Sequence, residues 1–227
     1  NKELCITCST DSIIWTRDIN GMPFKAGPVR ALGFTREDQF IFQSKWDVWS
    51  YDAVNDTLTC ITERQGEQRQ IELSLNKKNR DSIYVDIPTS YISGFNKLNK
   101  SMHLFNWLRH DDHYDLIENL ASPHKLQSLI WSGDGEKAML RRSTVSQYPN
   151  IEVIDKQFQK VKLISNANPQ QKDVSWPTVE LVKWYSYDSI LLEGLVYLPE
   201  DYDTSKQYPL MIYYYELNSD NLHNYRS

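Results

Sequence analysis

Residues 178–199 read TVELVKWYSYDSILLEGLVYLP, and residues 208–215 read YPLMIYYY. The first stretch predicts a strand, a turn and a second strand, followed by a loop that Pro199 opens. The run 210–215 has no two-residue alternation, so we expect a strand buried on both faces. A buried parallel strand needs a crossover helix and a neighbouring strand, and the sequence offers neither before Ser227. We therefore expect the chain to be part of a larger protein in which a second domain begins here.

The composition is that of a folded, β-rich protein. Of the 227 residues, 40% are hydrophobic and 12% aromatic, which is enough for a sizeable core and one or two domains. Seven Trp and fourteen Tyr suit strands better than helices. A net charge of −5 without any Lys/Arg run argues against a nucleic-acid partner. No apolar run approaches the roughly 20 residues that span a bilayer, so we expect no transmembrane segment.

Residues 1–172 consist of short strand-like runs separated by turn signals. Turn chemistry occurs at Asn20-Gly21, Asn55-Asp56 and Gly133-Asp134-Gly135. Helical periodicity is almost absent. The clearest predicted strands are 13–15, 39–42, 47–51, 58–61, 82–85, 102–105 and 138–140.

An internal repeat links the two halves of this region. Phe34-Thr35, followed by Ile41-Phe42, is echoed by Trp131-Ser132, followed by Met139-Leu140. The phrase that starts at Asp52 and runs into 58–62 is likewise echoed from Asp155 into 161–165. Both repeats have a spacing of roughly 100 residues, about two blades of a β-propeller. The sequence therefore favours four-stranded antiparallel blades over a sandwich.

Residues 165–173 are polar, contain Pro169 and show no periodicity, which is typical of a linker. We place a domain boundary near residue 172. The prediction is a mainly β chain, with the C-terminal blades of a propeller in 1–172 and the N-terminal strands of a truncated α/β domain in 173–227.

The order of several short motifs resembles the junction between propeller and hydrolase domain in the prolyl oligopeptidase superfamily, nearest its dipeptidyl-peptidase-like, bacterial exported branch. The resemblance covers 178–215 well and the preceding blades loosely. Two positions depart from the family pattern: Ser189 follows Asp188 where Gly is preferred, and Glu216-Leu217-Asn218 follow Tyr215 where small residues are usual. The motifs are Trp184-x-Ser186-x-Asp188, Glu193-Gly194-Leu195-Val196-Tyr197-Leu198-Pro199 and Lys206-x-Tyr208-Pro209-Leu210-Met211-Ile212-x-x-Tyr215.

This resemblance implies an α/β-hydrolase domain and a serine-type peptidase that hydrolyses short peptides after Pro or Ala through an acyl-enzyme. No Gly-x-Ser-x-Gly motif occurs in the chain, so no residue receives a triad role and these 227 residues alone should be inactive. One supporting role carries over: Tyr215 matches the tyrosine whose hydroxyl helps to bind the oxyanion. The alternative is a core tyrosine.

The resemblance further implies short peptide substrates, no cofactor and no metal, and a periplasmic or extracellular location; it leaves the oligomeric state open. A function of a different class also fits: a non-catalytic propeller that binds peptides or glycans beside a degenerate hydrolase domain. A stand-alone propeller is disfavoured, because 210–215 would then form a sticky edge.

Several residues invite a chemical role and have a plainer interpretation. Cys5, Cys8 and Cys60 cannot all pair within the chain. Cys5-x-x-Cys8 could be a redox or metal half-site, but no second Cys/His pair with zinc spacing exists, and we expect Cys5 and Cys8 to be buried or unpaired thiols.

Three further groups could have a chemical role but also have a purely structural interpretation. His110-Asp111-Asp112-His113 could bind a metal, yet its charged surroundings predict an exposed loop. The acids of the run 63–69 do not match the family's paired substrate-binding acids. The phrase Asp47-Val48-Trp49 has a structural interpretation. The last group could form a sugar-stacking surface but is assigned to strand packing: Trp15, Trp46, Trp49 and Trp131.

Overall fold

The computed structural model describes residues 5–8, 10, 12–16, 30–110, 113–215 and 217–225. It is mainly β, as the sequence predicted, with three four-stranded sheets and one two-stranded sheet. Every pair of neighbouring strands is antiparallel. Within the described ranges, no helix is long and apolar enough to cross a membrane.

The three four-stranded sheets follow one another along the chain, each with its strands paired in sequence order. The first sheet contains β1 (Ala31–Phe34), β2 (Phe40–Gln43), β3 (Val48–Asp52) and β4 (Thr57–Cys60). The second contains β5 (Ile71–Lys77), β6 (Ser90–Asn96), β7 (Met102–Arg109) and β8 (Tyr114–Ser122). The third contains β9 (Lys125–Trp131), β10 (Lys137–Ser143), β11 (Asn150–Asp155) and β12 (Lys160–Leu163).

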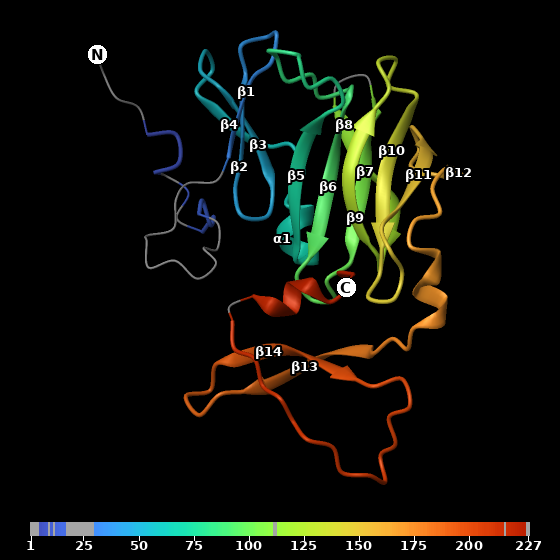
Figure 1. Cartoon of the computed structure of the whole chain (residues 1–227). Coiled ribbons are helices and arrows are strands. Elements are labelled where there is room, and N and C mark those ends of the chain that lie inside the picture. The colour runs from blue at the N-terminus through green and yellow to red at the C-terminus, as the bar shows by residue number, and fades with distance from the viewer. Residues whose placement is uncertain are drawn as a thin grey trace.

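The sheets lie side by side, with the first and third flanking the second (Figure 1). The second sheet buries both of its faces because successive side chains along a strand point to opposite sides. Ile92 and Phe105 belong to the core shared with the first sheet. Tyr91 and Leu104, one residue away on the same strands, belong to the core shared with the third. Each pair of sheets thus has its own apolar layer.

The repeat seen in the sequence matches the first and third sheets. Phe34 ends β1 and Trp131 ends β9, while Asp52 ends β3 and Asp155 ends β11. One whole sheet lies between the two copies, so the spacing of roughly 100 residues corresponds to two sheets. The turns predicted at 55–56 and 133–135 connect β3 to β4 and β9 to β10. Asn20-Gly21 lies outside the described residues.

A separate hairpin follows the third sheet. It lies below the three sheets in Figure 1, and a short 3-10 helix near the C-terminus lies between it and them. The predicted linker 165–173 is partly a 3-10 helix, and Asn150 and Tyr148 contact it through hydrogen bonds. The elements of this part are η1 (Pro169–Asp173), β13 (Thr178–Tyr185), β14 (Leu191–Leu198) and η2 (Asn218–Asn221).

The expectation of a buried strand at 210–215 is wrong for this structure. The segment has no strand hydrogen bonds, and its side chains are exposed, from 60% at Ile212 to 94% at Met211. Among the described strands, none pairs with it. A strand needs a neighbour to satisfy its backbone N–H and C=O groups, so without one the run stays extended and exposed. In the described part of 173–227, the strands form the hairpin β13–β14 and no α/β-hydrolase sheet.

Two other predicted strands are also wrong. Residues 13–15 form a bend followed by irregular structure, although Trp15 packs against Phe42 and Trp49. Residues 82–85 are irregular, with a bend at 83–84, and the Ser82 hydroxyl donates to the Tyr84 carbonyl at 2.9 Å. Local side-chain hydrogen bonds of this kind compete with strand pairing.

The helix α1 (Gln65–Arg69) was not predicted. It has only five residues, too few for a periodic pattern.

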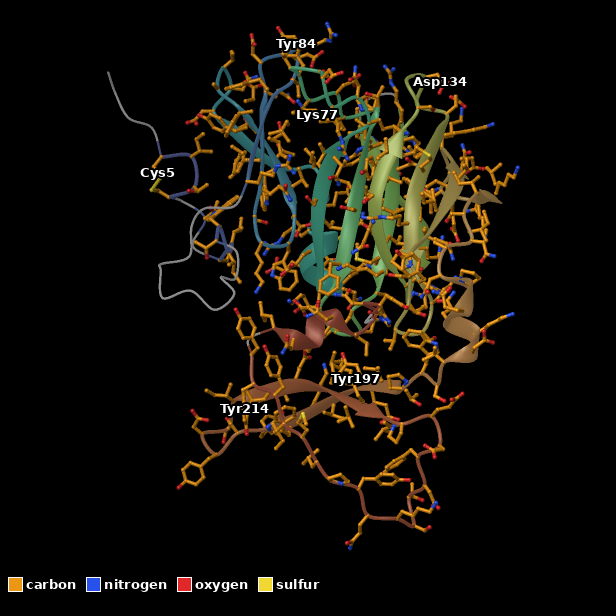
Figure 2. The ribbon with its side chains drawn as sticks, in the orientation of Figure 1. Cys5, Lys77, Tyr84, Asp134, Tyr197 and Tyr214 are labelled. Atoms are coloured by element: carbon orange, nitrogen blue, oxygen red, sulfur yellow. A yellow bond between two sulfur atoms is a disulfide. The ribbon has the colours of Figure 1, made fainter. Side chains whose placement is uncertain are left out.

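The interpretation of Cys5 and Cys8 as buried or unpaired thiols is wrong as well. The two residues form a disulfide and are exposed, and Figure 2 shows Cys5 beyond the outer side of the first sheet. A turn with two residues between the cysteines brings their Cα atoms to 5.5 Å, a common spacing for a disulfide. Cys60 remains a free thiol, and burial raises its pKa.

Candidate functional site

The contact between the sheets and the C-terminal hairpin is built around Lys100. This residue lies in the turn between β6 and β7, and its side chain is 2% exposed. Its ammonium group donates to Glu193 Oε2 on β14 at 2.6 Å and to Asp220 Oδ1 on η2 at 3.1 Å. A third hydrogen bond, to the Lys97 carbonyl at 2.8 Å, satisfies its remaining donor. The buried charge is therefore fully paired.

Further charges extend this contact in both directions. Lys97 reaches the other oxygen of Asp220 at 2.6 Å, and Lys183 on β13 reaches the other oxygen of Glu193 at 2.9 Å. Burial alone would raise the pKa of Glu193, but hydrogen bonds from Lys100 and Lys183 outweigh it and lower that pKa. The alternation of positive and negative groups fixes the hairpin and η2 against the end of the second sheet.

Next to Lys100, three side chains form a Ser–His–Glu series. Ser101 Oγ lies 2.7 Å from His103 Nε2, and His103 Nδ1 lies 2.9 Å from Glu118 Oε1. Arg69 of α1 forms an ion pair with the other carboxylate oxygen of Glu118, Oε2. Burial alone would raise the pKa of Glu118, but the contacts with Arg69 and His103 outweigh it and lower that pKa.

The order of contacts in this series is that of a nucleophile, a base and an orienting acid. Ser101, however, is 8% exposed, and its hydroxyl also lies 2.6 Å from Asn99 Oδ1. A substrate carbonyl could not approach Oγ without displacing that turn, so the geometry supports a structural role. It ties β7 to β8 and, through Arg69, to α1.

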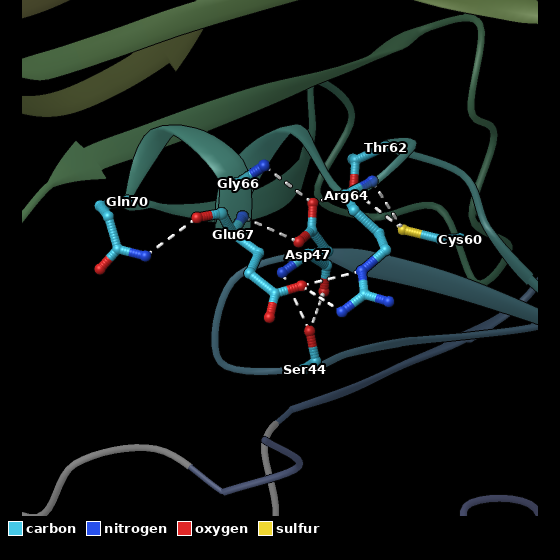
Figure 3. A network of polar contacts seen from close by, with 8 residues as sticks. All are labelled: Ser44, Asp47, Cys60, Thr62, Arg64, Gly66, Glu67 and Gln70. Carbon is cyan, nitrogen blue, oxygen red and sulfur yellow. Dashed lines mark hydrogen bonds and ion pairs between the residues drawn. The ribbon is translucent and has the colours of Figure 1, made fainter. Parts of the chain in front are cut away.

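A second buried polar centre lies between the first and second sheets (Figure 3). Asp47, 2% exposed, accepts hydrogen bonds from the Thr62 hydroxyl at 2.7 Å, from Gly66 N at 3.0 Å and from Glu67 N at 3.1 Å. The carboxylate thereby satisfies the first N–H groups of α1, which have no partner within a helix. This agrees with the structural interpretation of the 47–49 phrase.

A basic cavity of about 390 Å³ opens between β1 and β5. Three cations line it, Arg30, Lys77 and Arg80, and no acid is found among the described residues of its lining. Lys77 lies at the end of the sheets remote from the hairpin (Figure 2). Arg80 donates to the Leu129 carbonyl at 3.2 Å, which holds it beside the third sheet. Such a lining suits an anionic group, for example a carboxylate.

Tyr215, the oxyanion donor expected from the resemblance, is 64% exposed. Its ring stacks on Tyr213 at 6.5 Å, and the structure brings no described acid, histidine or serine of a catalytic group to it. Figure 2 shows the neighbouring Tyr214 at the level of the hairpin, below the three sheets. The interpretation of Tyr215 as a core tyrosine does not hold in this structure.

The other candidate residues have clear positions. His110 and His113 are exposed at the β7–β8 turn, as predicted, whereas Asp111 and Asp112 lie outside the described residues. Trp49 is buried, and Trp15 and Trp131 pack against apolar clusters. Trp46 is half-buried under the Lys45 ammonium group. Three of the four tryptophans thus contribute to packing, as expected.

Sequence reasoning missed the Lys100 contacts and the Ser–His–Glu series. The segment 96–101 reads NKLNKS and predicts only a turn. Its partners Glu193 and Asp220 are more than ninety residues away in sequence, and no local pattern points to them.

Comparison with known proteins gives no family assignment. No family model matches the chain, and no curated protein is significantly similar to it. The function must therefore be argued from the motifs and from the geometry above.

Proposed function

We propose that this chain belongs to a serine-type peptidase of the prolyl oligopeptidase superfamily. In this proposal, residues 1–172 supply late blades of a β-propeller, and residues 173–227 begin the α/β-hydrolase domain. The propeller admits short peptides to the cleft between the domains, and the hydrolase domain cleaves them after Pro or Ala through an acyl-enzyme. The nucleophile, the acid and the histidine lie outside these 227 residues.

One observation carries the proposal. Three consecutive four-stranded antiparallel sheets, packed face to face, are followed by a hairpin that contains the family phrases around Trp184 and Glu193. Glu193 also forms an ion pair with Lys100, which lies in the β6–β7 turn of the second sheet. The motif therefore lies at the contact between the two parts, where the superfamily has its interdomain junction.

The exposed run 210–215 supports the same proposal. Six consecutive large apolar or aromatic side chains at 60–94% exposure form a surface that soluble proteins rarely leave uncovered. In the proposed enzyme, this run is an inner strand of the hydrolase sheet, and neighbouring strands cover it.

Tyr215 then lies at the end of that strand, where its hydroxyl can donate to the oxyanion. Removing such a donor costs about 10²–10³ in kcat. The test uses the product of the whole gene and chromogenic Xaa-Pro and Xaa-Ala substrates. Tyr215→Phe should reduce kcat by about 10²–10³, while the control Tyr214→Phe should leave it within a factor of a few. Equal activity of Tyr215→Phe and wild type would show that the Tyr215 hydroxyl does not stabilise the oxyanion.

A non-catalytic binding module is the second candidate, and the basic cavity between β1 and β5 favours it. Three cations in one cavity would bind the terminal carboxylate of a peptide. If the whole-gene product binds short peptides with free C-termini but hydrolyses none, and Arg80→Ala abolishes the binding, this second function replaces the first.

A further inference from the structure

The β7–β8 hairpin places three metal-binding side chains on one face. Arg109 on β7 pairs with Tyr114 on β8, and His110 N donates to the His113 carbonyl at 2.9 Å, one step further along. His110 and His113 are therefore cross-strand neighbours. Asp115 follows His113 by two residues, so it shares the same face. The alternation of the strands thus brings together two imidazoles and a carboxylate.

The distances between these groups are short. His110 Nε2 lies 2.9 Å from Asp115 Oδ2, and His113 Nε2 lies 3.5 Å from Asp115 Oδ1. All three ligand atoms lie within 4.8 Å of one another. The two imidazole rings stack with centroids 4.7 Å apart and planes 12° from parallel.

We propose that His110, His113 and Asp115 form a binding site for a divalent transition-metal ion, with Zn²⁺ as the ion that fits best. Zinc binds imidazole nitrogen and carboxylate oxygen at about 2.0–2.2 Å, so two ligand atoms of a tetrahedral site lie about 3.3 Å apart. The two observed N···O separations, 2.9 and 3.5 Å, lie on either side of this value. The ligand atoms of the third pair lie within 4.8 Å of one another. For both imidazole nitrogens to bind one ion, the rings must turn out of their stacked arrangement, which their exposure to solvent allows.

The donor set also selects the class of ion. Two imidazoles and one carboxylate suit Zn²⁺, Cu²⁺ and Ni²⁺, whereas Mg²⁺ and Ca²⁺ prefer sites made of oxygen ligands. Three protein ligands leave one tetrahedral position for water or for an added ligand. The side chains are 41%, 54% and 40% exposed for His110, His113 and Asp115, so the ion can exchange with solvent.

The site is distinct from the contact around Lys100. The C-terminal end of β7 and the N-terminal end of β8 lie at the end of the second sheet opposite to β13 and β14 (Figure 1). A metal ion here would fasten the end of the β7–β8 hairpin and would not touch the interdomain contact. The inference is therefore independent of the proposed peptidase function.

Titration of the 227-residue chain with Zn²⁺, followed by calorimetry, tests the site. One equivalent should bind. His113→Ala and Asp115→Ala should each weaken binding by at least about tenfold, since even outer-shell partners of a metal ligand are worth 10–100-fold. His124→Ala, which removes a histidine of the β8–β9 turn outside the cluster, should leave the affinity unchanged. No binding by wild type, or equal affinity of wild type and His113→Ala, would overturn the proposal.

Cobalt(II) gives a second readout that does not depend on stability. Co²⁺ in a tetrahedral N₂O site should show visible d–d bands in wild type and in His124→Ala, and these bands should vanish in His113→Ala. Intense near-ultraviolet thiolate absorption would instead mean that Cys60 holds the ion, which would contradict the assignment. Zn²⁺ should also raise the urea midpoint of wild type but not of His113→Ala, because only a folded hairpin binds it.

Discussion

Lys100 Nζ donates a 2.6 Å hydrogen bond to Glu193 Oε2 and so joins the β6–β7 turn to strand β14. The lysine side chain is 2% exposed, whereas the glutamate is 22% exposed. The same ammonium group contacts Asp220 on η2. A single buried cation thus holds both C-terminal elements against the second sheet.

Removing this cation should destabilise the C-terminal part. Lys100→Met should lower the free energy of unfolding by about 2 kcal/mol, below the 3–5 kcal/mol typical of a broken buried pair, because Lys183 and Lys97 still neutralise the two acids. Urea unfolding followed by tryptophan fluorescence measures the change. Lys206→Met, with a 67% exposed side chain, is the control and should change it by less than about 0.5 kcal/mol. Equal stabilities of the two variants would contradict the role of Lys100.

Glu193 should make stability depend on pH in the acid range. Its pKa in the folded protein lies below the ordinary value of 4.5, so its contribution is fully present above that value. The contribution is lost as the pH falls through the lowered pKa. The urea midpoint should therefore drop more steeply below pH 4.5 in wild type than in Glu193→Gln. Glu200→Gln, in the exposed turn after β14, should behave as wild type. If the urea midpoint of Glu193→Gln falls with pH as steeply as that of wild type, ionised Glu193 does not contribute to stability in this way.

Asp47 should be among the most sensitive positions of the first two sheets. Asp47→Ala leaves the Thr62 hydroxyl and the first N–H groups of α1 without their acceptor, at a cost of about 3 kcal/mol. The half-buried Asp52 also accepts two backbone N–H groups, so Asp52→Ala is a matched control and should cost less than about 1 kcal/mol. Thermal unfolding of both variants checks the difference, and a reversed order would refute it.

Gly66 should tolerate no side chain. A Cβ there would lie 2.1 Å from the Trp46 carbonyl oxygen and 2.8 Å from that of Ile71, and both contacts are with backbone. We expect Gly66→Ala to destabilise by about 3 kcal/mol, the upper part of the range for overpacking. A Cβ added at Gly133 would have no atom within 4 Å, so Gly133→Ala should leave the free energy of unfolding nearly unchanged. Similar unfolding midpoints for both variants would show that α1 can shift to make room.

Much of the fold could be predicted from local patterns. Ile41, Val48 and Phe105 lie in predicted strands and are buried, since apolar runs between turn residues specify strands directly. The roughly 100-residue repeat also predicted that the segments around Phe34 and Trp131 are equivalent, and in the structure these two residues end the first strands of the first and third sheets.

The errors share a physical cause. The exposed run near Met211 was predicted to be buried because composition alone cannot supply the neighbouring strand that burial requires. The contact between Lys100 and Glu193 spans 93 residues, and a charged residue in a turn looks the same in sequence whether it is solvated or buried. By contrast, the sequence indicated His110 and His113 as possible metal ligands, but beside Asp111 and Asp112 rather than Asp115. What was missing was the strand register that places His110, His113 and Asp115 on one face.

The central claim, that this chain belongs to a serine peptidase, is tested most directly by covalent labelling. The whole-gene product is treated with a fluorophosphonate probe, and the intact mass is measured, with the 227-residue chain as a matched control. The account predicts one adduct on a single serine of the longer product and none on the control. A folded longer product that gains no adduct would contradict the peptidase assignment and leave the binding module in its place.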